Sequence, residues 1–217
     1  MTKMFISFFL LMGFSCAAQQ PEFKGGLETF VRANTVYPPY SQANCIEGRV
    51  TINFKLDQQG RVFNAFVKSG IGTDLDDEAL RLIRMSSGKW KVPVGYDTTY
   101  VLVVPVNFKL DGYDCGNKSK AEIQQAINAY KSSDALANAV LNFYINKEKG
   151  IYNVADEPKI LALRKELGYD KAYMEQRIKD GMAKLKQEDK EGACEDFLFV
   201  KHMGFDLADE QLQKYCR

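Results

Sequence analysis

The stretch Gly48–Leu56, GRVTINFKL, decides the fold. From Val50 onward its even-numbered side chains are apolar, whereas the side chains between them are polar. This period of two predicts a strand with one buried face and one solvent face. Residues 57–60, DQQG, follow as a turn, and residues 61–68 then run back as a second strand. We expect a hairpin in which Phe63, Ala65 and Val67 lie on the inner face.

A helix and a third strand follow the hairpin. Thr73 and Asp76 have the spacing of a capping box, so a helix is expected from there to about Met85. Residues 100–110 alternate again, with the even-numbered residues inward. Pro105 has no backbone N–H and therefore belongs on an edge strand or at a bulge. The outward-facing set of the third strand is Val101, Val103, Pro105, Asn107 and Lys109, and Tyr100 begins the strand.

These elements predict an α+β fold. A right-handed crossover through the helix places the first strand of the hairpin in the middle. The result is a three-stranded antiparallel sheet, order 2-1-3, with helices on one face. Leu27, Phe30 and Val31 have helical spacing and predict a short helix before the sheet.

An all-α helical unit follows. From Asn117 onward no strand pattern occurs, and glycines lie near the joints of the expected helices. We expect helices over 120–131, 134–147, 158–167, 171–187, 190–203 and 207–216. The predicted division is therefore a signal peptide at 1–18, an α+β domain at 27–112 and a helical domain at 118–217.

The N-terminus has the pattern of an exported protein. An apolar run, Met4–Phe14, follows Lys3 and precedes small residues, as in a secretory signal peptide. It is short for a membrane-spanning anchor, which needs about 20 apolar residues. Alternatively, Cys16 is the lipidated cysteine of a lipoprotein, although Gly13 stands where such a box usually has Leu. Both interpretations place the chain in the periplasm, or membrane-attached as a lipoprotein.

The cysteines support export. Without Cys16, an even number remains, which is typical of disulfides in an exported protein. The sequence permits three pairings, and four free thiols are the alternative. We favour Cys45–Cys115 and Cys194–Cys216, because each pair then lies within one predicted domain.

Composition and motifs argue against several function classes. The net charge is +1, so the chain lacks the positive field that nucleic acid requires. His202 is the only histidine, and no CxxC, Walker, Rossmann or G-x-S-x-G motif occurs. The acids at 74–78 fit a helix start better than a cation site. We expect no enzyme, no metal and no cofactor; an acidic pocket around His202 would reverse this.

The first half resembles the C-terminal domain of TonB energy transducers. The residues that carry the resemblance stand in the family's order and spacing: Tyr37-Pro38, Ile46-Glu47-Gly48-Arg49-Val50, Phe54-x-Leu56-Asp57-x-x-Gly60-Arg61-Val62, Ser69-Gly70, Leu75-Asp76 with Ala79, Trp90, and Pro105-Val106-x-Phe108. The resemblance implies a domain that binds the N-terminal peptide of an outer-membrane transporter. The peptide adds as a strand to the edge made by the last strand, here Tyr100–Lys109.

Other features leave alternatives open. We expect neither the membrane anchor nor the Pro-rich spacer of a full transducer, and therefore a binding surface without the motor. Alternatively, the edge made by Tyr100–Lys109 is covered by the helical half or by a second copy of the chain. In a further alternative, the chain is a disulfide-stabilised scaffold that self-associates through this edge as a homodimer. At such positions, residues like Tyr37 and Trp90 more often pack inside the domain than contact a partner.

In the helical half, Gly181, Ala193 and Phe197 have the spacing of a tetratricopeptide repeat.

Overall fold

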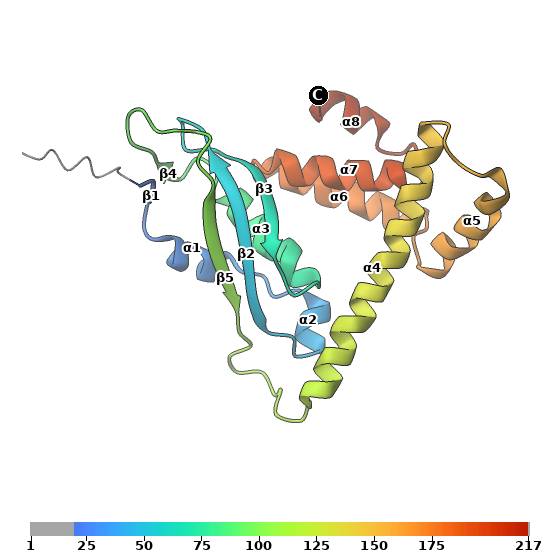
Figure 1. Ribbon diagram of the computed structural model, residues 1–217, viewed down its shortest axis with the longest axis horizontal. Coiled ribbons are helices and arrows are strands. Elements are labelled where there is room, and N and C mark those ends of the chain that lie inside the picture. The colour runs from blue at the N-terminus through green and yellow to red at the C-terminus, as the bar shows by residue number, and fades with distance from the viewer. Residues whose placement is uncertain (1–19, 217) are drawn as a thin grey trace, which may run out of the picture.

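The computed structural model describes residues 20–216. The predicted signal peptide and Cys16 lie outside the described residues. The first half contains eight short elements, and Figure 1 shows them as one layer of strands with helices against it. In chain order they are β1 (Glu22–Phe23), α1 (Leu27–Asn34), α2 (Pro39–Ala43), β2 (Gly48–Leu56), β3 (Val62–Ser69), α3 (Asp74–Met85), β4 (Trp90–Lys91) and β5 (Leu102–Phe108).

The main sheet has the order β3-β2-β5, with both pairs antiparallel. This order confirms the one expected from the crossover and from Pro105. A second sheet was not expected: β1 pairs with β4 through Glu22–Lys91 and Phe23–Trp90. Strands of two residues are too short for a period of two to reveal them.

The core of the first half lies between the sheet and α3. The inward residues of β2 are completely buried, as their alternation predicts. They pack against the apolar stripe of α3, and burial of such side chains contributes about 1.5–3 kcal/mol each. The β2 residues concerned are Val50, Ile52, Phe54 and Leu56, and those of α3 are Leu75, Ala79, Leu82 and Ile83.

The return strand β3 departs from the prediction at Phe63. Lys55 pairs with Phe63 but Asn53 pairs with Phe66, so β3 has one more residue than β2 between these pairs. Asn64 has a positive φ of 51° within this irregularity. Such a β-bulge changes the face on which the preceding residues lie. Phe63 is therefore 37% exposed on the outer face, whereas Ala65 is buried as expected.

The second half is helical, as predicted. It contains α4 (Lys120–Glu148), the short 3-10 helix η1 (Val154–Asp156), α5 (Glu157–Glu166), α6 (Lys171–Lys186), α7 (Lys190–His202) and α8 (Asp209–Tyr215). The predicted break between 131 and 134 is wrong, because α4 is continuous. Ser132 stays helical and its hydroxyl donates to the carbonyl of Asn128 at 2.9 Å. A separate apolar cluster, which includes Met174 and Phe197, forms the interior of this half.

Two disulfides close the structure. Cys45 bonds to Cys115, and Cys194 bonds to Cys216, which are the two expected pairs. The first bridge fastens the linker beside α2, where the hydroxyl of Tyr40 donates to the carbonyl of Ala126 at 2.8 Å. The start of α4 thus contacts the first half, while its end lies among α5–α8 (Figure 1). Among residues 20–216, no helix has the length and apolar character of a membrane span.

Candidate peptide-binding edge

The outer edge of β5 carries backbone groups that point away from the sheet. The N–H of Leu110 donates to the carboxylate of Glu47, which precedes β2. Even-numbered residues of β5 therefore direct their backbone groups toward β2, and odd-numbered residues direct theirs outward. Pro105 pairs with Thr51 in this register, so its nitrogen, which has no hydrogen, faces outward. Its position on the edge explains how the sheet tolerates a proline.

The predicted edge residues are exposed, but only some lie in the strand. Val103, Pro105 and Asn107 belong to β5. Tyr100, Val101 and Lys109 flank β5, and all six are exposed. Within residues 20–216, we find no acceptor for the outward N–H groups of Val103 and Asn107. The edge is therefore open at two donors with Pro105 between them.

A groove runs between this edge and helix α1. Its volume is about 980 Å³, and both elements contribute lining residues. Leu27 and Val31 of α1 form one wall, and Val104 and Val106 of β5 form the other. Val104 is only partly buried, so the apolar interior of the sheet is accessible here. Charged side chains border the groove: Glu28, Arg32, Arg49, Lys109 and Asp111.

Helix α1 is held in place at its C-terminal end. The guanidinium of Arg81 donates to the carbonyl of Asn34 at 2.8 Å, and the N–H of Val36 donates to Glu78 at 2.8 Å. Arg81 and Glu78 also form an ion pair of 2.6 Å. No residue of α1 is fully buried. These polar contacts with α3, together with the packing of Leu27 and Val31 against the core, set the position of the groove wall.

Tyr37 closes one end of the groove as a packing residue. Its hydroxyl donates to the carbonyl of Ile46 at 2.6 Å, and its ring lies edge-on to Phe108 with centroids 6.0 Å apart. Burial, followed by the negative charges of Glu47 and Asp74, raises the pKa of Tyr37 to about 12. Pro38 comes next and is the N-cap of α2. The Tyr-Pro element therefore fixes the path of the chain into the sheet.

Trp90 and two motif glycines also have structural positions. Trp90 is buried, and its indole N–H donates to the hydroxyl of Ser86 at 2.8 Å. Gly60 has a φ of 74°, and a Cβ there would lie 2.1 Å from the Trp90 carbonyl oxygen. Gly48 has a φ of 155°, and a Cβ there would lie 2.8 Å from the Ile71 side chain. Glycine is required at position 60, where a Cβ would meet backbone, whereas at position 48 the contact is with the end of a side chain that can move.

The edge of β3 differs from that of β5. The N–H of Val62 donates to the hydroxyl of Ser87 at 3.0 Å, and that of Asn64 donates to Glu191 at 3.2 Å. Figure 1 shows the helical half on the β3 side of the sheet, away from β5. The alternative in which the helical half covers the β5 edge therefore does not describe this structure.

The acids at the start of α3 act within the loop that precedes the helix. Thr73 is the N-cap residue, but its side chain does not cap the helix, so the predicted capping box is not formed. Instead Asp76 accepts the N–H groups of Ile71 and Gly72, each at 2.9 Å. His202 ends α7, in the other half. Among residues 20–216, no cluster of His, Cys, Asp and Glu suited to a metal ion occurs.

Residues 33–110 match the model of the Gram-negative bacterial TonB protein C-terminal. The match includes the end of α1, the whole β3-β2-β5 sheet and α3, and it indicates a TonB-like protein-binding role for this part of the chain. The helical half lies outside the match. No curated protein and no solved structure gives a significant match.

Proposed function

We propose that this chain is an exported binding module that takes up an extended segment of an outer-membrane transporter, or of another envelope partner, by strand addition to β5. The proposed place of action is the periplasm, free or lipid-anchored, as part of TonB-dependent transport. The role is non-catalytic and needs no cofactor. The helical half would add a tetratricopeptide-like interaction unit.

The open edge beside the groove carries this proposal. An added strand would satisfy the outward N–H groups of Val103 and Asn107, and its alternate side chains would enter the groove between α1 and β5. The floor and walls there are apolar and partly exposed, so the side chains would bury further apolar area. Main-chain pairing supplies affinity, and the groove supplies selectivity.

Titration with a peptide tests the proposal. Isotope-labelled protein is titrated with the N-terminal peptide of an outer-membrane transporter, and backbone amide shifts are recorded. We expect the shifts to cluster at Val103 and Asn107 and to spare Val62 and Asn64 on β3. Shifts that cluster on β3, or that spread without a centre, would refute strand addition to β5.

A matched pair of variants isolates the main-chain contribution. Val103→Pro removes one outward donor, whereas Val103→Ala shortens the same side chain and keeps the N–H. One hydrogen bond contributes about 0.5–1.5 kcal/mol, so Val103→Pro should weaken binding about two- to twelvefold relative to Val103→Ala. Equal dissociation constants would place the peptide elsewhere.

Self-association through the same edge is the second candidate. An open strand edge is a template for another chain, and β5 is open in this structure. Sedimentation at several concentrations distinguishes the two functions. A concentration-dependent dimer that Val103→Pro abolishes would favour the scaffold, and a monomer that still binds the peptide would favour the module.

A further inference from the structure

The second edge strand of the sheet, β3, contacts the first turns of α7. The carbonyl of Arg61 accepts from the N–H of Asp57, the first residue after β2, at 2.9 Å, so the next outward-facing N–H groups on β3 belong to Val62 and Asn64. Both have acceptors outside β3: Ser87 in the turn after α3 for Val62, and Glu191 of α7 for Asn64. Because unpaired donors on an edge recruit other strands, these contacts remove the template from this part of β3.

One buried arginine holds α7 in this position. Arg84 of α3 is 8% exposed and donates two hydrogen bonds to Glu195, at 2.7 and 2.6 Å. Its Nε lies 3.5 Å from a carboxylate oxygen of Glu191 and 4.0 Å from one of Asp189. Asp189 in turn accepts the N–H of Gly192 at 2.8 Å and so caps α7. All three carboxylates thus come from the start of α7 and meet a single guanidinium.

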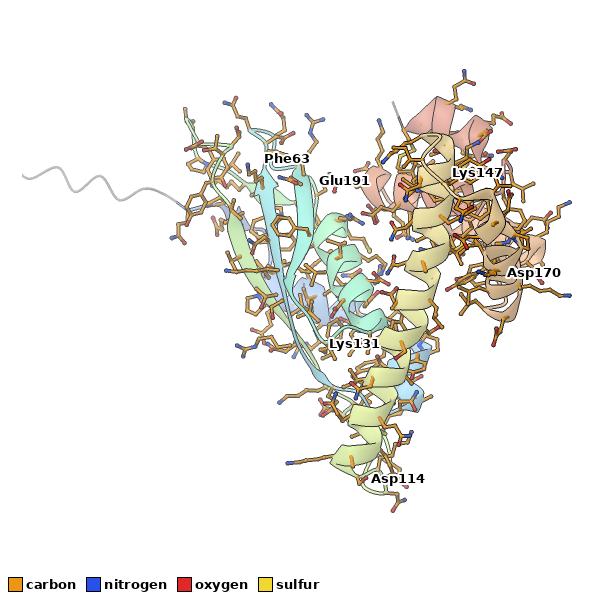
Figure 2. All side chains as sticks on the ribbon, turned by 45° about the vertical axis from the view of Figure 1, so that its right-hand side comes forward. Phe63, Asp114, Lys131, Lys147, Asp170 and Glu191 are labelled. Carbon is orange, nitrogen blue, oxygen red and sulfur yellow. A yellow bond between two sulfur atoms is a disulfide. The ribbon has the colours of Figure 1, made fainter. Side chains whose placement is uncertain are left out.

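The contacts join segments far apart in the sequence. Asn64 and Glu191 are 127 residues apart, and Arg84 and Glu195 are 111 residues apart. Figure 2 shows Glu191 near Phe63, at one end of the sheet. Helix α4, which carries Lys131 and Lys147, lies on the same side of the sheet as Glu191. The helical half is therefore docked at the bulge of β3.

We propose that the start of α7 is a plug for the β3 edge, and that it prevents the chain from pairing edge to edge with other copies. With both edges open, β3 of one copy could pair with β5 of the next. Such a head-to-tail contact builds rings or open filaments. With this part of β3 plugged, β5 remains available. This assigns a protective function to the helical half, and it does not rest on what β5 binds.

Amide exchange tests the plug in the full chain. Glu191→Ala removes the acceptor of the Asn64 N–H, and Glu191→Gln keeps an acceptor there. A hydrogen bond to a charged group is among the stronger ones, so exchange at Asn64 should become about tenfold faster in Glu191→Ala and return toward the native rate in Glu191→Gln. Glu166→Ala is the matched control, because this exposed carboxylate lies on α5 away from the sheet. Equal exchange at Asn64 in Glu191→Ala and Glu166→Ala would overturn the plug.

Sedimentation velocity tests the protective function. Glu191→Ala combined with Glu195→Ala removes two of the three carboxylates around Arg84, and both are surface residues, 45% and 56% exposed. We expect this double variant to form larger concentration-dependent oligomers than the native chain and Glu166→Ala. Retained protection of the β2 amides shows that the double variant is folded. A folded double variant that exchanges rapidly at Asn64 but matches the native chain in oligomeric state would overturn the protective function.

Discussion

Pro105 gives the sharpest prediction, because one substitution adds a single donor to the proposed binding edge. Pro105→Val places an N–H where the register directs the nitrogen outward, between the donors of Val103 and Asn107. An added strand then gains one main-chain hydrogen bond. That bond contributes about 0.5–1.5 kcal/mol, so the dissociation constant for a transporter peptide should fall about two- to twelvefold.

The stability of the fold should change little. Loss of proline costs about 0.4–1 kcal/mol through the unfolded chain, and valine favours strands, which offsets part of that cost. Isothermal titration calorimetry measures the affinity, and thermal unfolding measures the stability. Pro93→Val is the control, because Pro93 lies in the loop after β4 and outside the groove.

If Pro105→Val and Pro93→Val bind the peptide with the affinity of the native chain, while both remain folded, the nitrogen at 105 does not face the partner. An open edge with a further donor should also associate with itself more readily. Sedimentation at the titration concentrations therefore accompanies the calorimetry.

Three further predictions concern the framework that positions the groove. Gly60→Ala should lower the free energy of unfolding by more than about 2 kcal/mol, because a Cβ there meets the backbone of β4 at 2.1 Å; Gly88→Ala has the same φ of 74° with open space around it and should cost about 1 kcal/mol. Chemical denaturation compares the two, and equal losses would contradict the close approach. Cys45→Ser with Cys115→Ser opens a disulfide that spans 70 residues and should lower the free energy of unfolding by about 2–5 kcal/mol. A reductant should destabilise the native chain at least as much, because it also opens Cys194–Cys216. The pKa of Tyr37 is raised from 10 to about 12, so the contribution of Tyr37 to stability is present below pH 10 and is lost as the pH rises toward 12. Tyr37→Phe should flatten this decline in the free energy of unfolding with pH. The same pH profile in Tyr37→Phe and the native chain would count against the buried hydroxyl.

The sequence predicts the parts of the fold that depend on local periodicity. The alternation in Gly48–Leu56 gives the bounds and the buried face of β2. Pro105 and a single right-handed crossover together predict the strand order and the position of the third strand on an edge. The exposed residues of that edge could therefore be named in advance.

Features that depend on single residues or on distant contacts could not be predicted in this way. The bulge requires Asn64 to adopt a positive φ, and no periodic pattern reports it. Continuity of α4 depends on Ser132 remaining helical, although serine is common at helix ends. The docking of α7 depends on Arg84, whose partners are more than a hundred residues away. The groove likewise depends on Arg81 and Glu78, which hold the C-terminal end of α1 from more than forty residues away.

Site-specific photo-crosslinking in cells tests the central claim most directly. A photoreactive side chain is placed at Val103 on β5 or at Phe66 on β3, two positions of equal exposure, 49% each. The account predicts that position 103 captures a partner from the cell envelope and that position 66 does not. Capture from position 66 with none from position 103 would contradict the claim that β5 is the binding edge.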